Sequence, residues 1–220
     1  VVTKDFTWNL NLTFARNTNK LASFSNNEYA MVQMNTGYFS EDLKTYTQRI
    51  VEDEPIGNFY GPKWLGFDAN GDNIFEDLDD DGKLSDGDNQ VIGNAYPDFT
   101  FSIQNSFSYK NFDLSVTMRG AFGFQNINFT RLHYENYRDQ AMNNLKAGYE
   151  KVFGKAVLTD SKQFNSYYVE DGDYWKIDNI VLGYNFKKDF IKGIKGMRLY
   201  FSVQNALTIT GYKGLDPEVG

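Results

Sequence analysis

The acidic segment between Asp77 and Asp88 is the part of this sequence whose residue types and spacing most clearly indicate chemistry. A loop of the D-x-D-x-D-G type binds calcium through alternate residues, whose carboxylates curl toward one point, while a glycine at position 6 permits the sharp turn. Position 7 contributes only its backbone carbonyl, so a lysine is tolerated there. The sequence therefore predicts a structural Ca²⁺ site with the ligands Asp77, Asp79, Asp81, Lys83, Ser85 and Asp88.

The end of this segment leaves one point open. Position 12 of the loop is Asp88, where such loops usually carry a glutamate, and the shorter side chain leaves its ligation undecided. In the alternative interpretation the segment is a solvated acidic loop, in which Ser85 and Asp88 form a capping box over one helical turn. Just upstream, the Asn70-Gly71 pair predicts a hairpin turn and not a second metal site.

The elements that must position this loop are strands. Apolar and polar residues alternate through residues 99–109 and, after Lys110 and Asn111, through residues 112–119, which predicts two long strands joined by a tight turn. Eleven residues at about 3.3 Å each extend roughly 36 Å. Tilted by about 45°, such a strand covers roughly 25 Å, the height of the apolar band of an outer-membrane barrel. Strands of a soluble sandwich are usually half as long.

Apolar and polar residues also alternate, as clearly or less clearly than in residues 99–119, in other parts of the sequence. This pattern predicts further strands at 6–14, 20–35, 45–51, 56–67, 175–186 and 197–209. The alternation slips by one residue near Asp178 and Asn179, which predicts a β-bulge. Residues 135–151 have the spacing of a short helix within an otherwise unpatterned stretch. The connections are expected to alternate between short ones (16–19, 52–55, 110–111, 187–196) and long ones (37–44, 68–96, 124–165), as in barrels whose long loops face the exterior.

Composition narrows the possible classes of protein. No window contains the eighteen or more apolar residues of a spanning helix, but a barrel strand needs apolar residues on one side only, so the low mean hydropathy is compatible with lipid contact. The absence of cysteine excludes disulfides and Cys-based zinc sites, and a single histidine, His133, excludes a histidine cluster. The net charge of −7 disfavours nucleic acid as a partner. The strand pattern begins by Phe6, so we expect no signal peptide here and expect the chain to be a piece of a longer protein.

Several short motifs follow one another in a characteristic order along nearly the whole chain. They lie at residues 55–61, 77–82, 91–94, 97–99, 105–114, 169–174, 179–184, 204–205 and 214–218. Their shared order resembles the C-terminal barrel portion of SusC/RagA-type TonB-dependent receptors.

The resemblance implies an all-β fold, an antiparallel transmembrane β-barrel of about 22 strands around a plug. Residues 1–220 would form the C-terminal part of this one barrel domain, without the plug, the TonB box, the early strands and the last strand. It implies a transporter and not an enzyme, placed in the outer membrane of Bacteroidetes-type bacteria and surrounded by outer-membrane lipid. It also implies import of glycans or peptides, with energy from TonB, reached through the missing N-terminal region, and with a SusD-like surface lipoprotein as a lid.

In such a barrel, the polar strand faces line a hydrated lumen and the long loops face outward, and both regions supply candidates for substrate contact. These candidates are Tyr60, Trp64, Tyr96, Arg119, Lys176 and Arg198, with Asp113 and Asp178 on the same polar faces as the last three. The aromatic residues are suited to stack on sugar rings or, alternatively, to pack in the fold or in an interfacial girdle. The charged residues are suited to substrate contact or, alternatively, to a solvated lining or a salt bridge with the plug.

Two other functions compete with import. The first is a secreted, calcium-stabilised β-sandwich that binds carbohydrate. The second, a glycan-cleaving enzyme, is disfavoured because acid and base roles need two carboxylates held apart in a cleft, whereas most carboxylates here crowd one loop.

Overall fold

The chain forms two compact units in a computed structural model that describes residues 1–24, 31, 33–39, 43–69, 72–135, 163–188 and 190–218. The first unit comprises Val1–Asn17, Pro97–Gly123 and Asp173–Gly211, and the second comprises Thr18–Tyr96, Phe124–Gly172 and Tyr212–Gly220. Among the described residues, no helix has the length and apolar character needed to cross a membrane.

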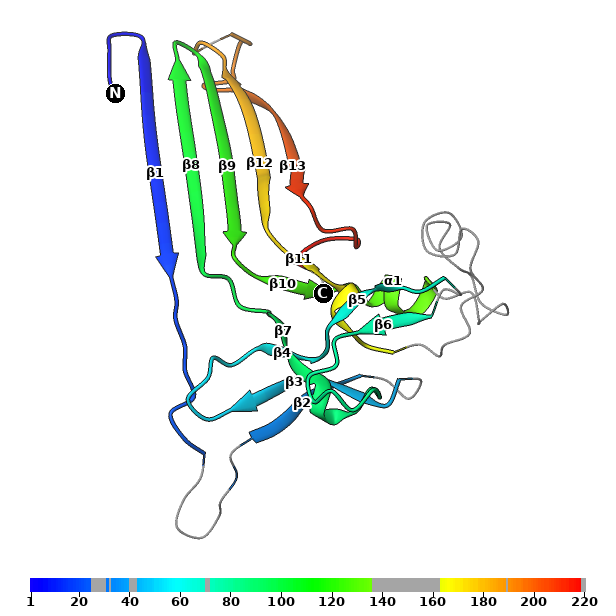
Figure 1. Ribbon diagram of the computed structural model, residues 1–220. Coiled ribbons are helices and arrows are strands. Elements are labelled where there is room, and N and C mark those ends of the chain that lie inside the picture. Colours follow the sequence, from blue (N-terminus) through cyan, green and yellow to red (C-terminus); the bar gives the residue numbers. More distant parts are fainter. Residues whose placement is uncertain are drawn as a thin grey trace. The chain divides into compact units, whose positions relative to one another are not determined.

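The first unit is a single antiparallel sheet of five long strands in the order β1-β8-β9-β12-β13 (Figure 1). The strands are β1 (Phe6–Arg16), β8 (Phe99–Tyr109), β9 (Phe112–Phe122), β12 (Tyr174–Asn185) and β13 (Arg198–Thr210). The predicted hairpin of residues 99–109 and 112–119 is therefore confirmed, with Lys110 at a φ of 54° in its tight turn. The predicted bulge is confirmed as well, because the register of β12 shifts between Ile177 and Asn179 against both neighbouring strands.

The registers of this sheet place apolar side chains on one face and polar side chains on the other. On the apolar face, Leu12 lies opposite Ile103 and Ile103 lies opposite Met118. Much of this face is exposed, as the 66% exposure of Leu12 and the 69% exposure of Phe201 show. Within the described part of this unit no second sheet covers the apolar face. The alternative prediction of a β-sandwich is therefore wrong for these strands, because a sandwich buries this face between two layers.

One polar side chain interrupts the apolar face. Asn105 of β8 lies among the apolar side chains, and its Oδ1 accepts a hydrogen bond of 3.0 Å from the indole Nε1 of Trp8. An unsatisfied polar group facing hydrocarbon costs several kcal/mol, so this bond makes an asparagine tolerable there.

The connections between strands correct part of the sequence interpretation. Residues 20–35 were expected to return along β1, but residues 20–24 form no strand, and β1 pairs with β8, so that Arg16 lies opposite Phe99. The chain leaves the sheet after β1, β9 and β13, and these three exits lie at one end of it, since Phe99 also lies opposite Phe122, and Tyr174 lies opposite both Ala121 and Thr210. Both short connections, β8 to β9 and β12 to β13, lie at the other end. The segments 16–19 and 52–55 are therefore not short turns between wall strands.

The second unit contains a four-stranded sheet in the order β2-β3-β4-β7. Its strands are β2 (Gln33–Phe39), β3 (Thr45–Val51), β4 (Asn58–Pro62) and β7 (Asn89–Asn94). The remaining elements are the paired strands β5 (Trp64–Phe67) and β6 (Asn73–Phe75), the pair β10 (Gln125–Ile127) and β11 (Val169–Asp171), the helix α1 (Phe129–Tyr134), and the 3₁₀ turns η1 (Asp86–Asp88) and η3 (Ser166–Tyr168).

These elements revise two sequence predictions and leave two partly outside the described residues. The strand expected at 56–67 is divided into β4 and β5, and the loop expected at 68–96 contains β6, η1 and β7. The strands β5 and β6 pair as the predicted hairpin requires, although Asn70 and Gly71 themselves lie outside the described residues. Of the helix expected at 135–151, only Glu135 is described, as the residue that caps the end of α1.

The core of the second unit joins segments that are far apart in the sequence. Its buried apolar side chains include Phe59 of β4, Ile127 of β10, Leu132 of α1, and Phe164 just before η3. Burying a side chain of this kind contributes about 1.5–3 kcal/mol. This cluster therefore fixes residues 124–135 and 163–172 against the four-stranded sheet, and it positions the sites described next.

Candidate functional site

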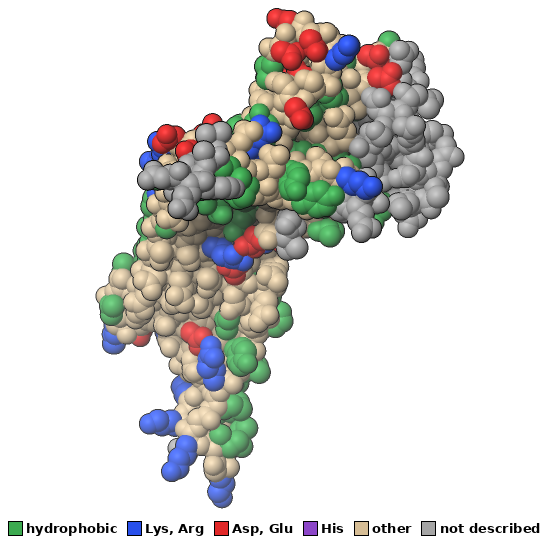
Figure 2. All heavy atoms as spheres, turned by 90° about the horizontal axis from the view of Figure 1, so that it is seen from below, with side chains coloured by type: hydrophobic (Ala, Val, Ile, Leu, Met, Phe, Trp, Pro, Cys, Tyr) green, Lys and Arg blue, Asp and Glu red, His purple; other side chains and the backbone are tan. Residues whose placement is uncertain are grey.

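The acidic loop of the second unit brings three carboxylates to one point. Asp77, Asp79 and Asp81 each offer one carboxylate oxygen, and these oxygens lie within 4.8 Å of one another. The loop curls because the Gly82 N–H donates to Asp77 at 2.8 Å and the Lys83 N–H donates to Asp81 at 2.7 Å. All three aspartates are exposed, and acidic side chains gather close together on the face shown in Figure 2. Three convergent carboxylates are the donor set that a hard cation such as Ca²⁺ prefers.

The electrostatics of this loop are unfavourable in the absence of a cation. Desolvation raises the pKa of Asp79, and repulsion from the neighbouring carboxylates of Asp81, Asp88 and Asp77 raises it further, against a backbone hydrogen bond from Asp81 that lowers it. The Asp79 carboxylate also lies against Gly87, where a Cβ atom would come within 2.7 Å of Asp79 Oδ2. Glycine at position 87 therefore lets the two parts of the loop approach each other.

The end of the loop forms the capping box of the alternative interpretation. Ser85 caps η1, with its Oγ accepting from the Gly87 N–H at 2.9 Å. The Asp88 carboxylate is fully buried and accepts from the backbone N–H groups of Leu78, at 2.8 Å, and Ser85, at 2.7 Å. These hydrogen bonds hold the pKa of Asp88 below its usual value. Asp88 thus ties the two ends of the loop together, and any ligation by Asp88 would have to share these oxygens.

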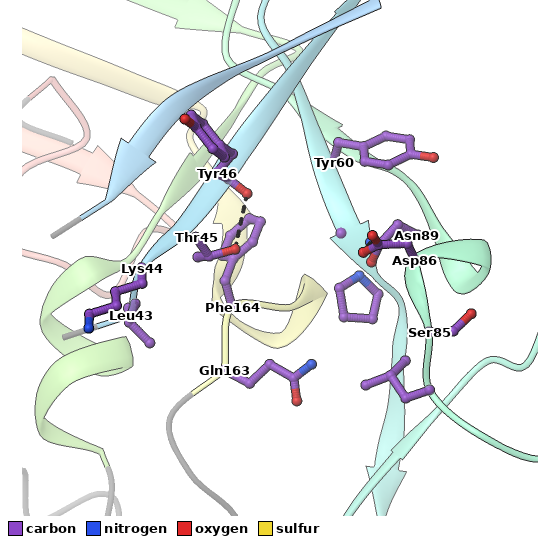
Figure 3. A pocket seen from close by; sticks show the side chains of 13 residues that line it. Leu43, Lys44, Thr45, Tyr46, Tyr60, Ser85, Asp86, Asn89, Gln163 and Phe164 are labelled. Carbon is purple, nitrogen blue, oxygen red and sulfur yellow. Dashed lines mark hydrogen bonds between the residues drawn. The ribbon is translucent and has the colours of Figure 1, made fainter. Parts of the chain in front are cut away.

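A pocket of about 390 Å³ lies beside this loop in the second unit (Figure 3). The strands β3 and β4 pair only through Gln48 and Phe59, and the pocket opens beyond that point. Its lining comes from four segments, as Leu43, Lys44, Thr45 and Tyr46; Tyr60, Gly61 and Pro62; Leu84, Ser85, Asp86 and Asn89; and Gln163 and Phe164. The acidic loop and η1 therefore supply one wall of the pocket.

The three aromatic residues predicted from the sequence lie in different surroundings. Tyr60 lines the pocket, and the guanidinium carbon of Arg49 lies 3.6 Å from the centroid of its ring. Trp64 packs with its ring centroid 4.6 Å from that of Tyr167, and its indole donates to Asn73. Tyr96 is 52% exposed and covers Gly57. Trp64 therefore packs in the fold, which was the alternative to sugar stacking that the sequence offered for these three aromatic residues.

The structure brings two of the charged candidates together on the polar face of the first unit. The Arg119 Nε donates to both carboxylate oxygens of Asp178, at 2.9 and 2.8 Å. Lys176 lies opposite Arg119 in the register and is only 7% exposed. Asp178 is the extra residue of the bulge, and the bulge brings its carboxylate within reach of Arg119.

The third charged candidate, Arg198, forms an ion pair across an intervening strand. Its Nη2 lies 2.5 Å from Oδ2 of Asp113, although Arg198 belongs to β13 and Asp113 to β9. Gly183 of β12 lies between them, and a Cβ atom there would come within 2.5 Å of the Asp113 carboxylate and 2.6 Å of the guanidinium. The missing side chain at Gly183 therefore makes room for an ion pair that joins β9 and β13 across β12.

The sequence analysis missed a buried ionic cluster in the second unit. The Arg131 guanidinium donates to Glu135 at 2.5 Å and to Glu170, and the three side chains are only 11%, 3% and 9% exposed. Asn128 also donates to Glu170, and the Tyr167 hydroxyl donates to Glu135, each at 3.3 Å. The i,i+4 spacing of Arg131 and Glu135 was the only signal in the sequence.

The cluster keeps the Arg131 guanidinium charged. Burial by itself would lower the pKa of Arg131, but the hydrogen bonds to Glu135 and Glu170 outweigh burial and raise it. Burial raises the pKa of Tyr167 to about 12, so its hydroxyl stays a donor. Because the Lys213 N–H donates to Glu170 at 2.9 Å, the cluster also fastens the segment after β13.

Comparison with known proteins agrees with these features. The chain is 31% identical over 240 residues to TonB-dependent receptor P3 of Formosa agariphila, a match that covers 99% of this chain and 24% of that receptor. It is 28% identical over 237 residues to TonB-dependent receptor SusC of Bacteroides thetaiotaomicron, covering 100% of this chain and 23% of that receptor. This chain is a homologue of the SusC/RagA-type TonB-dependent receptors. It spans about a quarter of the length of these relatives.

Solved structures place this receptor segment in the same fold. It matches the structure of the RagAB peptide transporter with a TM-score of 0.76 and 21% identity, over 100% of this chain and 25% of that one. A second structure, of the RagAB peptide importer in the "closed-closed" state, gives a TM-score of 0.78 and 21% identity, over 100% of this chain and 26% of that one. No protein-family model matches the chain. The barrel fold class expected from the sequence is confirmed, and the relatives are named as receptors, in agreement with the prediction that the chain is not an enzyme.

Proposed function

We propose that the receptor containing this segment lies in the outer membrane and imports a nutrient, a glycan or a peptide, through its barrel. The observation that carries this proposal is the five-stranded sheet of the first unit, with one exposed apolar face and one polar face. An apolar outer face contacts lipid, and a polar inner face lines a hydrated lumen. The ion pairs of Arg119 with Asp178 and of Arg198 with Asp113 then belong to the lumen wall.

We further propose the partners that the receptor family implies. A SusD-like surface lipoprotein would act as a lid, and TonB would supply energy through a part of the receptor outside this segment. The topology supports a lid, because both long excursions from the sheet, between β1 and β8 and between β9 and β12, leave it at the same end. These excursions would gather on one side of the membrane, where a lid could contact them.

A genetic experiment tests this function. In the parent bacterium, deletion of the receptor gene should abolish growth on one oligosaccharide or peptide mixture, while growth on free monosaccharides and amino acids continues. The full-length receptor should restore growth, and the same receptor without its TonB box should not. The lipoprotein should co-purify with the full-length receptor in detergent. Unchanged growth of the deletion strain on every oligosaccharide and peptide mixture would contradict the proposal.

We also propose that the acidic loop binds Ca²⁺ through Asp77, Asp79 and Asp81, with backbone or side-chain oxygens of Lys83, Ser85 and Asp88 as the further candidates. The support is the convergence of three carboxylates within 4.8 Å and the mutual repulsion that a divalent cation would remove. The role would be structural, because the ion would hold the loop that forms one wall of the pocket.

Calorimetric titration of calcium into the folded receptor tests this site. The unmutated protein should release or absorb heat with one-site stoichiometry, and Asp79→Ala and Asp81→Ala should each abolish the signal. Asp80→Asn is the matched control, because it removes a carboxylate from the same loop and keeps a residue type that tolerates the φ of 57° at position 80. The absence of heat in the unmutated protein, or an equal loss of binding in Asp80→Asn, would count against this ligand set.

A further inference from the structure

Positive charge is concentrated at the end of the five-stranded sheet where both short connections lie. Residues 187–196, which join β12 to β13, contain four lysines and one aspartate, a net charge of +3 in a chain whose net charge is −7. We call residues 187–196 the basic connection. Its lysines and the lysine of the β8–β9 turn are all exposed, and they are Lys187, Lys188, Lys192, Lys195 and Lys110. Among the described residues, none of the five forms an ion pair with a carboxylate. This end of the sheet therefore attracts anions.

Backbone hydrogen bonds hold the two short connections next to each other (Figure 1). The Asn185 N–H, at the end of β12, donates to the carbonyl oxygen of Asn111 in the β8–β9 turn at 2.8 Å. The Phe186 N–H then donates to the carbonyl oxygen of Met197 at 2.9 Å, and this bond closes the base of the basic connection. Lys110 and the basic connection therefore belong to one surface.

A row of aromatic rings continues the apolar face of the sheet to this surface. Phe112 of β9 and Tyr184 of β12 lie opposite each other in the register, with ring centroids 4.7 Å apart. The ring of Tyr184 lies 4.9 Å from that of Phe186, and the ring of Phe186 lies 4.7 Å from that of Phe190. The exposed apolar side chains of the basic connection are Phe190, Ile191 and Ile194. Exposed apolar and basic side chains thus lie together within ten residues.

This combination fits the boundary of a lipid bilayer. Aromatic rings favour the level of the lipid headgroups, and a lysine there lays its methylene groups along apolar surface while its ammonium reaches the headgroups. Lys110 already lies beside such a ring, with its Nζ 5.2 Å from the centroid of Tyr109. A cluster of lysines at this level attracts anionic lipid. A second copy of the chain docked through the same surface would instead bring like charges together, which is unfavourable.

We propose that the basic connection binds anionic phospholipid, with its four lysines pairing with headgroup phosphates and Phe190 inserted among the upper carbons of the acyl chains. The proposal rests on the outer-membrane location given above, because it needs the apolar face of the sheet to contact lipid. The short connections of bacterial barrels face the periplasm, so the lipid would belong to the inner leaflet. Bound lipid would fix the depth of these wall strands in the membrane.

Lipid binding to the full-length receptor, purified in a neutral detergent, tests this proposal. Native mass spectrometry would count the lipids that the receptor retains when it is titrated with dioleoylphosphatidylglycerol, which is anionic, or with dioleoylphosphatidylethanolamine, which has the same acyl chains and no net charge. The anionic lipid should bind about tenfold more tightly, and a higher ionic strength should reduce this preference. Replacing Lys187, Lys188, Lys192 and Lys195 together with glutamine should remove it.

The matched control replaces four exposed lysines of the second unit with glutamine, which removes the same charge from elsewhere in the chain. These lysines are Lys20, Lys44, Lys63 and Lys213. The control should keep the preference for the anionic lipid within about twofold, because charges far from the lipid are screened by salt. A further variant, Phe190→Ser, keeps every lysine and should weaken the binding of both lipids. Unheated gels would show whether each variant still migrates as a folded barrel.

Two soluble competitors separate the possible occupants of this surface. Glycerol phosphate carries the headgroup charge without acyl chains, and polyglutamate represents an acidic protein. At equal charge concentration, neither should displace the anionic lipid. Displacement by glycerol phosphate would indicate a site for free anions, and displacement by polyglutamate would indicate a site for an acidic protein, so either result overturns the proposal.

The proposal is also overturned if the two lipids bind equally, if the variant without the four lysines keeps its preference, or if the control loses the preference to the same extent. Binding of both lipids that is unchanged in Phe190→Ser would overturn the inserted role of that ring. The growth experiment above does not depend on lipid preference. A receptor that restores growth but binds the two lipids equally would therefore contradict this inference alone and leave the proposed function standing.

Discussion

Replacing Ile103 with arginine should markedly destabilise the receptor in a lipid bilayer. Ile103 lies near the middle of β8 on the apolar face, between Leu12 of β1 and Met118 of β9. An arginine on the lipid face of a barrel costs about 2–4 kcal/mol at the bilayer midplane. The full-length receptor carrying Ile103→Arg should therefore have a smaller free energy of unfolding when it is unfolded at equilibrium from lipid vesicles. Less of this variant should migrate as the compact folded form in unheated gels.

The matched control is Gln104→Arg, one residue further along the same strand. Gln104 points to the polar face, since successive side chains of a strand alternate between faces. An arginine there would face the hydrated lumen. The free energy of unfolding of the Gln104→Arg receptor should therefore stay close to that of the unmutated receptor. A larger loss for Gln104→Arg than for Ile103→Arg would show that the two faces have been assigned the wrong way round.

Replacing Arg131 with methionine should strongly destabilise the second unit. The substitution leaves the carboxylates of Glu135 and Glu170 buried without their cation, at side-chain exposures of 3% and 9%. Removing one partner of a buried ion pair costs about 3–5 kcal/mol. Hydrogen exchange of the full-length receptor should therefore show faster exchange in residues 124–135 and 163–172, while the strands of the first unit keep their protection.

The pH dependence of this variant gives a second measurement. Without Arg131, burial should raise the pKa values of the two glutamates above their unfolded values, so the folded state would bind more protons than the unfolded state. The destabilisation should be greatest at neutral pH and should shrink as the pH falls toward the unfolded glutamate pKa of about 4.3. The triple variant Arg131→Met, Glu135→Gln, Glu170→Gln should recover part of the loss at neutral pH. If the triple variant is as unstable as Arg131→Met alone, the cluster acts through packing and not through charge.

The strand pattern could be read from the sequence wherever one side of a strand must face a different solvent from the other. Residues 99–122 satisfy this condition, and both strands, the turn at Lys110 and Asn111, and the later bulge near Asp178 were predicted correctly. The alternation could not identify partners. A two-faced strand presents the same backbone edges to any neighbour, so the sequence placed residues 20–35 beside β1, whereas β8 occupies that place.

The second unit was less predictable because its contacts join segments with little periodicity. Leu21 was assigned to a strand, but its backbone bonds to Asp53 and Glu54 in a turn. The two interpretations of Asp88, as a metal ligand or as a cap, used the same residues, and the sequence could not tell that its carboxylate would be buried against two backbone N–H groups. Arg131 pairs with Glu170, which lies far along the chain. The packing of Leu132 and Phe164 in one core brings the two residues together.

The sequence by itself determined that this protein has long strands with one apolar and one polar face, and an acidic loop with calcium-type spacing. Both are local properties, since side-chain alternation and residue spacing act over a few neighbouring residues. Only the tertiary structure decided which strands form the sheet, that residues 33–94 build a separate sheet, and that Tyr60, Asn89 and Gln163 border one pocket. These features depend on contacts between residues tens of positions apart, and such contacts are selected by the burial of a shared core, which no local pattern records.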